Sequence, residues 1–256
     1  MNDRGLRRFF VKAVRKGQGA CSITGSEARH ICRVLRMEPG ERLVLVDQEG
    51  NRFLGSILQS HPREVRVAVE KALPFPGPPP VEICMCQALI KSGPMDDLIR
   101  KTSELGVASI SLFFSERTVI RMDESRIPKK MDHWKKIALA ATKQSDRHAP
   151  ARIEGPSPFV DLVARWKSSP ALKVILWEGE GARDLKSLLH AVPQVERVVG
   201  IVGPEGGFAE KEVALAGNAG FISASLGDRI LRSETAAVTM VTIIQYEWGD
   251  LGLSSG

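Results

Sequence analysis

The 256-residue chain lacks several features that would place it in a specialised class of protein. It has no apolar run approaching the roughly 18 uncharged residues of a membrane-spanning helix, and its basic segment 1–17 lacks the apolar stretch of a secretory signal. Its four cysteines, Cys21, Cys32, Cys84 and Cys86, contain no C-x-x-C pair. The sequence therefore predicts a cytoplasmic protein with small buried thiols, and neither a metal site nor a disulfide framework.

Common nucleotide-binding motifs are also missing, and the sequence gives little support for a hydrolase. The chain has no G-x-G-x-x-G after an apolar run and no G-x-x-x-x-G-K-[ST], so dinucleotide and P-loop sites lose their main support. It has no clear Ser/His/Asp arrangement either, which argues against a serine hydrolase.

Positive charge is present in excess, and it is concentrated in the first third of the chain. Residues 1–73 hold 14 lysines and arginines against 8 acidic residues, whereas the remaining residues hold 22 of each. Clustered basic residues of this kind are typical of surfaces that bind nucleic acid phosphates. The candidate RNA contacts in this segment are Arg7, Arg8, His30, Arg33 and Arg36.

A proline-rich segment divides the chain. Residues 73–80, LPFPGPPP, have too few backbone donors for a central strand and favour a stiff connection. The sequence thus predicts domains at 1–73 and 74–256. The first reads as β-rich, with alternating apolar residues in its strands and a short helix that Ser26 caps and that extends to Leu35.

The second domain alternates between strand and helix patterns. Strands are expected at the ranges 81–90, 107–114, 172–177, 195–203 and 221–225. Helices are expected from Pro94 to Gly106, around 133–142 and from Glu234 to Trp248. Such alternation predicts an α/β fold with a mostly parallel sheet covered on both faces. The last helix is apolar almost all round, so we expect a homodimer with Val241 in its interface.

Ligands of open parallel sheets bind beyond the carboxyl ends of the strands, where two loops are unusual. The first, Gly203–Phe208 (GPEGGF), combines glycines that allow close backbone approach with a stiffening proline. Glu205, Glu210 and Glu212 crowd the following helix start and would repel phosphate there. A cofactor without phosphate fits this loop better.

The second loop runs from Leu226 to Ala236. Leu226, Ile230 and Leu231 could form the wall of an apolar slot for an adenine ring, and Ser233 or Thr235 is expected to cap the next helix.

These loops carry a resemblance that extends over nearly the whole chain. It rests on GPEGGF at 203–208, LGDRILRSETA at 226–236, RRFFV at 7–11, HICRVLRMEPG at 30–40, ALIKSGPMDDLIRKTSELGV at 88–107, SER at 115–117 and QSDR at 144–147. In this order the motifs resemble the SPOUT methyltransferases, specifically the bacterial family that methylates N(3) of one uridine in 16S ribosomal RNA. Asp146 stands where that family commonly has glycine, and Ser233 stands where threonine is usual, which retains the hydroxyl group.

The resemblance implies S-adenosylmethionine, held by three loops of a trefoil knot, a PUA-like β-barrel before that domain, and a homodimer with no membrane association. The implied cofactor residues are Leu176, Trp177, Glu178, Gly203, Glu205, Gly207, Leu226, Ile230, Leu231 and Arg232. Arg147 is a further candidate RNA contact.

The chemistry limits the candidate catalytic residues. Uracil must lose its imide proton, so a base or a group that stabilises negative charge is required. We favour Arg232 as the stabilising group and leave the base open between Glu205 and Glu234. Two alternatives stay open: a SPOUT enzyme acting on another RNA, and an RNA-binding module without catalysis.

Overall fold

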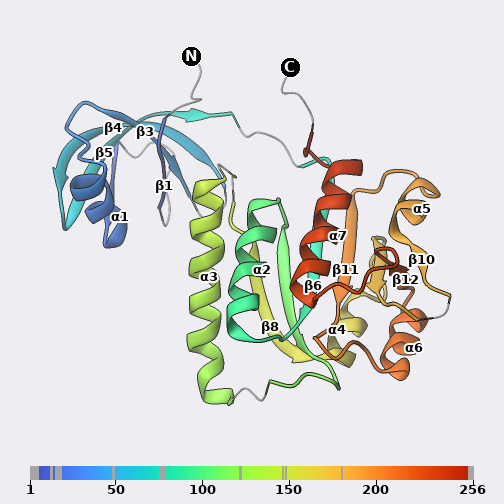
Figure 1. Ribbon diagram of the computed structural model, residues 1–256. Helices are drawn as coiled ribbons and strands as arrows, with labels where there is room; N and C mark the ends of the chain where they lie inside the picture. Colours follow the sequence, from blue (N-terminus) through green and yellow to red (C-terminus); the bar gives the residue numbers. More distant parts are fainter. Residues whose placement is uncertain are drawn as a thin grey trace. The chain divides into compact units, whose positions relative to one another are not determined.

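The computed structural model describes most of the chain (Figure 1). The described residues are 6–11, 14, 19–47, 50–74, 79–120, 123–145, 147, 149–179 and 181–252. The chain forms two compact units, Met1–Gly77 and Pro78–Gly256. No helix within the described ranges is long and apolar enough to cross a membrane.

The N-terminal unit is built on a five-stranded sheet. Its strands are β1 (Arg8–Phe10), β2 (Ala20–Thr24), β3 (Arg42–Val46), β4 (Arg52–His61) and β5 (Glu64–Leu73). Their order is β1-β3-β4-β5-β2, with β1 parallel to β3 and the other neighbours antiparallel. Alternate residues such as Leu43, Leu45, Val65 and Val67 are buried in the core of this unit.

The short helix of this unit differs from the expectation at its start. Helix α1 (Ser26–Arg29) continues into a π-helical turn, His30–Val34. Its N-cap residue is Gly25, at φ 72°, and no side chain caps the helix, so the predicted cap by Ser26 is wrong. A glycine tolerates this left-handed φ, so the turn that starts the helix lies at Gly25, one residue before Ser26.

The C-terminal unit contains a seven-stranded sheet in which every pairing is parallel. Its strands are β6 (Glu82–Ala88), β7 (Ser109–Phe114), β8 (Arg152–Pro158), β9 (Leu172–Leu176), β10 (Arg183–Asp184), β11 (Arg197–Val202) and β12 (Ile222–Ser225). Their order is β10-β12-β9-β11-β6-β7-β8. The predicted parallel α/β fold is confirmed, while the knot stays a prediction.

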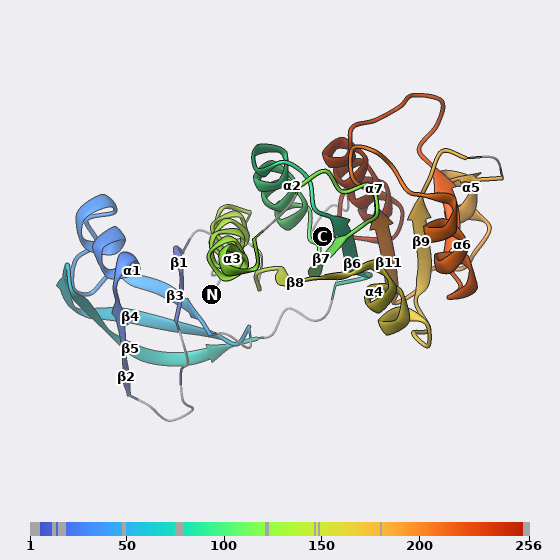
Figure 2. The same ribbon diagram turned by 90° about the horizontal axis from the view of Figure 1, so that it is seen from below.

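Helices cover both faces of this sheet (Figures 1 and 2). One face carries α2 (Ser92–Glu104), α3 (Ile127–Gln144), which follows a 3₁₀ turn at Glu124–Arg126, α5 (Leu185–His190) and α7 (Ser233–Trp248). The other face carries α4 (Phe159–Trp166) and α6 (Glu210–Asn218). Two separate apolar cores, one on each face, hold the sheet in place.

Helix α7 packs against α2, α5, β6 and β11 of its own unit. Ala237, Met240, Val241 and Ile244 are all fully buried there. Placing Val241 in a subunit interface is therefore wrong, because one chain alone covers it. The homodimer itself stays a prediction.

We predict that Val241→Asp destabilises the unit by more than about 3 kcal/mol, because a carboxylate at this fully buried position would lie within an apolar core. Urea unfolding measures the loss. Tyr246→Asp, at a position that is 73% exposed on the same helix, is the control and should change the stability little. Equal stability losses in the two variants would contradict the core assignment.

Candidate functional site

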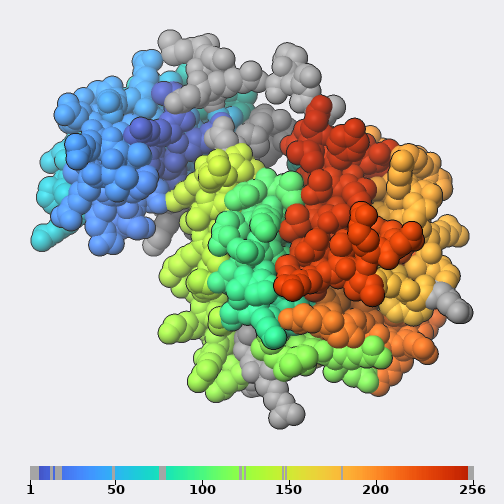
Figure 3. All heavy atoms as spheres, viewed as in Figure 1, coloured from blue at the N-terminus to red at the C-terminus, as the bar shows by residue number. Residues whose placement is uncertain are grey.

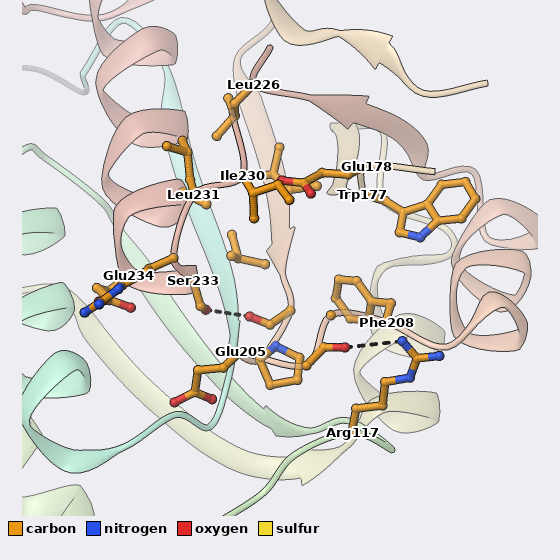
Figure 4. Close-up of a pocket in the computed structure, with 18 of the residues that line it drawn as sticks. Arg117, Trp177, Glu178, Glu205, Phe208, Leu226, Ile230, Leu231, Ser233 and Glu234 are labelled. Carbon is orange, nitrogen blue, oxygen red and sulfur yellow. Dashed lines mark hydrogen bonds between the residues drawn. The ribbon is translucent and has the colours of Figure 1, made fainter. Parts of the chain in front are cut away.

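A pocket of about 750 Å³ opens at the carboxyl edge of the sheet (Figure 4). Its walls come from the segments that follow three neighbouring strands: 176–179 after β9, 202–208 after β11 and 224–236 after β12. Because these strands are parallel and adjacent, in the order β12-β9-β11, their ends meet at one edge.

The structure brings together every residue that the resemblance assigned to the cofactor. All ten of these predicted residues line the pocket: Leu176, Trp177, Glu178, Gly203, Glu205, Gly207, Leu226, Ile230, Leu231 and Arg232. Glu234, the second candidate base, also lines the pocket. The geometry thus unites residues up to 58 positions apart in the sequence, and their individual roles stay predictions.

The GPEGGF loop depends on its glycines at two positions. The Gly207 N–H donates to the Pro204 carbonyl at 2.9 Å and closes a tight turn, and Gly207 has a φ of 67°. A Cβ at Gly203 would lie 3.0–3.3 Å from the Phe208 ring. A larger residue at either position would move this wall of the pocket.

Phe208 anchors the end of the same loop. Its ring is buried against Phe113 of β7 and Phe159 of α4, with ring centroids 5.3 to 6.3 Å apart among the three. Aromatic packing at these separations anchors the loop on the face of the sheet that α4 and α6 cover.

Glu212 in the first turn of α6 connects the GPEGGF loop to the loop after β7. Its buried carboxylate accepts hydrogen bonds from Ala209 N at 3.0 Å, Ser115 Oγ at 3.0 Å and Glu116 N at 3.0 Å. The next residue, Arg117, donates from Nη1 to the Gly206 carbonyl at 3.3 Å and lines the pocket. One carboxylate therefore accepts the Ala209 backbone N–H at the start of α6 and fixes the backbone next to Arg117, whose side chain lines the pocket.

The pocket also has the expected apolar wall. Leu176, Leu226 and Leu231 are half-buried in it, while Ile230 is 87% exposed at its side. Figure 4 shows the side chains of Leu231 and Ile230 between α7 and the β9 loop. An isoleucine exposed to this degree, beside an open pocket, is available to cover an apolar group.

Charged groups of both signs line the rest of the pocket. The carboxylates are Glu178, Glu205 and Glu234, and the cations are Lys91, Arg117 and Arg232. Glu205 Oε1 accepts a hydrogen bond from the backbone N of Lys91 at 3.3 Å. Sequence reasoning gave no role to Lys91 or Arg117, although both lie in motifs that carried the resemblance.

The first turn of α7 differs from the expectation. Its N-cap residue is Arg232, and neither Ser233 nor Thr235 caps the helix. Ser233 Oγ instead donates to the Gly203 carbonyl at 2.5 Å and accepts from Gln87 Nε2 at 2.9 Å (Figure 4 draws the first of these). The hydroxyl bonds to β6 and to the loop after β11, so the predicted cap is wrong.

The comparisons with known proteins agree with this architecture. Residues 77–245 match the RNA methyltransferase domain family, and residues 23–70 match the RNA methyltransferase PUA domain family. The chain belongs to the RNA methyltransferase family. The resemblance inferred from the sequence is confirmed at this level, and so is the PUA-like N-terminal domain.

The relatives carry the same organisation along their full length. The chain is 31% identical to the ribosomal RNA small subunit methyltransferase E of Aquifex aeolicus, over 85% of this chain and 90% of that protein. It is 26% identical to the Bacillus subtilis protein of that name, over 94% and 97%. A putative methyltransferase from Legionella pneumophila, solved with bound SAM, is 31% identical with a TM-score of 0.85, over 96% of this chain and 99% of that one.

A second solved relative also contains the cofactor. The ribosomal RNA small subunit methyltransferase E from Neisseria gonorrhoeae, bound to S-adenosyl methionine, is 27% identical with a TM-score of 0.85, over 96% and 99% of the two chains.

The candidate RNA contacts of this methyltransferase lie in different environments. Arg7, His30, Arg33 and Arg36 are exposed, and Arg8 is half-buried in β1. In the other unit, Arg147 is directed inward.

Arg147 Nη1 donates to the carbonyls of Ser103 at 2.8 Å and Val107 at 3.0 Å, at the end of α2, and burial lowers the pKa of its guanidinium. This group is already engaged within its unit. Asp146, the neighbouring departure from the family pattern, lies outside the described residues.

The burial of the cysteines agrees with the expectation of small buried thiols. Cys21, Cys84 and Cys86 are buried free thiols and Cys32 is half-buried. Burial raises the pKa of Cys86 to about 12, which keeps it an unreactive thiol. Among the described residues no group of three or more His, Cys, Asp or Glu side chains could hold a metal ion.

We predict that Glu212→Gln weakens the fold around the pocket by about 2 kcal/mol. Both carboxylate oxygens accept N–H or O–H groups, so an amide NH₂ at either position would face a donor. Urea unfolding measures the change. Glu210→Gln, an exposed neighbour in the same helix turn, is the control, and an equally small effect in both variants would contradict the role of the buried carboxylate.

Proposed function

We propose that the chain transfers a methyl group from S-adenosylmethionine to N(3) of one uridine in 16S ribosomal RNA. The observation that carries the proposal is the pocket itself, because all ten residues that the resemblance assigns to the cofactor line one cavity. The names of the relatives support the small-subunit RNA as substrate, and the two SAM complexes support the cofactor.

The pocket suits this cofactor on physical grounds. Leu176, Leu226 and Leu231 offer an apolar wall for the adenine ring, and the glycines at 203 and 207 allow backbone contact. S-adenosylmethionine has no phosphate and carries a sulfonium and an ammonium charge, which the pocket carboxylates complement. When bound, it supplies an electrophilic methyl group.

The residues of the chain must then handle the proton and charge of the uracil. Glu205 and Glu234 both line the pocket, and we propose that one of them accepts the imide proton; the choice between them stays open. Arg232 is exposed at the pocket and can stabilise negative charge on a uracil oxygen. Lys91 and Arg117 add further cationic charge to the lining of the pocket.

Binding of RNA is proposed for the N-terminal unit. Its exposed cations on the segment from α1 to Arg36 form a basic surface beside the core residues Ala28 and Ile31. The proposal also includes a homodimer in the cytoplasm, as the resemblance implies.

We predict that Arg232→Ala lowers kcat about 100-fold while changing the Kd of S-adenosylhomocysteine less than threefold, because its charge acts mainly in the transition state. Methyl transfer to 16S ribosomal RNA and calorimetry measure the two quantities. Asp228→Ala, an exposed change in the same loop, is the control. Comparable losses in kcat and affinity would make Arg232 a cofactor-binding residue and contradict its proposed role.

We predict that the triple replacement of Arg7, Arg33 and Arg36 by Gln flattens the dependence of log K for RNA on log salt. Each lost phosphate contact should reduce the slope by roughly 0.7 to 0.9. Filter binding across a salt series measures the slope, and cofactor affinity should not change. An unchanged slope would mean that this surface is only solvated and that RNA recognition lies elsewhere.

A further inference from the structure

A buried hydrogen-bond chain lies beneath the cofactor pocket and joins three separate parts of the unit. Gln87 is near the end of β6, Gly203 follows β11, and Ser233 is the first residue of α7. Gln87 Nε2 donates to Ser233 Oγ at 2.9 Å, and Ser233 Oγ donates to the Gly203 carbonyl at 2.5 Å. Gln87 is fully buried and Ser233 is 7% exposed, so water does not compete strongly for these bonds.

The directions of these bonds follow from the groups that surround the glutamine. The Gly203 carbonyl can only accept a hydrogen bond, so the Ser233 hydroxyl donates its proton to that carbonyl. The Ser233 oxygen must therefore accept the bond from Gln87. The second N–H of the Gln87 amide donates to the Ala88 carbonyl at 3.0 Å. Both acceptors require the NH₂ group on this side, which fixes the orientation of the amide.

This arrangement leaves the other end of the Gln87 side chain unsatisfied. Its Oε1 is buried and has no hydrogen-bond partner among the described residues. A buried amide oxygen without a donor destabilises a fold. An apolar side chain of the same length at position 87 would remove that cost together with the two bonds that Nε2 donates, so the glutamine adds little net stability to the sheet.

We propose that Gln87 and Ser233 are positioning residues for methyl transfer: together they hold the Gly203 carbonyl and the start of α7 in the places that the reaction needs. Gly203 begins the loop that presents Glu205. Ser233 lies between Arg232 and Glu234, the two other candidate catalytic side chains. This inference rests on the proposed function.

The same geometry accounts for the residue type at position 233. The chain of bonds uses both the proton and the oxygen of a hydroxyl group at this position. The hydroxyl does not cap α7, and its two partners lie 30 and 146 positions away in the sequence. The hydroxyl connects the start of α7 to β6 and to the loop after β11, and formation of the helix does not require these bonds.

Four single variants of the full-length protein separate positioning from stability. Gln87→Met and Ser233→Ala break the chain of bonds, and Ser233→Thr keeps it. Thr102→Val is a matched control, because the buried Thr102 hydroxyl donates to Leu98 O within α2 and not to the pocket. Thermal unfolding, calorimetry with S-adenosylhomocysteine and kcat at saturating cofactor are measured for each.

We expect Gln87→Met to keep or raise the melting temperature while cofactor affinity or kcat falls about tenfold. Ser233→Ala should lose a similar factor, and Ser233→Thr should stay within about twofold of the unmodified protein. The double variant Gln87→Met/Ser233→Ala should lose no more than the larger single loss, since both changes break the same chain of bonds.

The proposal is overturned if Gln87→Met and Ser233→Ala both retain affinity and kcat within about twofold. It is also overturned if their losses only follow the loss of thermal stability, as measured on Thr102→Val. Failure of the proposed function would be distinct, because the unmodified protein would then neither bind S-adenosylhomocysteine nor methylate RNA.

Discussion

The pocket depends on the parallel alignment of β9, β11 and β12, whose carboxyl ends share one edge of the sheet. Strand β11 lies between β6 and β9, although both of these strands come before it in the chain. This order places the loop after β9 between the other two cofactor loops, and it places the GPEGGF loop after β11 next to β6. The same order brings Gln87 of β6 under that loop, within reach of the first residue of α7.

The buried polar contacts then fix those loops. Glu212 joins the GPEGGF loop to the loop that carries Arg117, and Gln87 with Ser233 joins it to α7. Space-filling atoms show the start of α7 and the loops around it lying together on one face of the C-terminal unit (Figure 3). A small number of side-chain bonds thus determines where the candidate catalytic side chains lie.

The sequence predicted the parallel α/β class because its strands are local apolar runs. The ten pocket residues came from the resemblance, and the structure places all ten in one pocket. The sequence did not predict contacts made over long distances. The hydroxyl of Ser233 looked like a helix cap, and only the tertiary fold shows that its partners are Gly203 and Gln87. Val241 looked like an interface residue, since sequence alone could not show that α2 and α5 cover α7.

Strand β8 was missed for a different reason. Pro156 and Pro158 argue against a strand in the sequence, yet β8 lies at the edge of the sheet, where one side needs no backbone donors. The start of α1 was also mispredicted, because a left-handed φ at Gly25 makes that glycine the N-cap residue in place of Ser26. Both cases show that the position of an element in the sheet or turn can override its residue preferences.

Nucleoside mass mapping of 16S ribosomal RNA tests the central claim most directly. The RNA is taken from cells in which the gene for this chain has been deleted, and from the same cells after the gene is restored. The account predicts that one 3-methyluridine is lost on deletion and returns on restoration. Unchanged 3-methyluridine, or the loss of a different modified nucleotide, would contradict it.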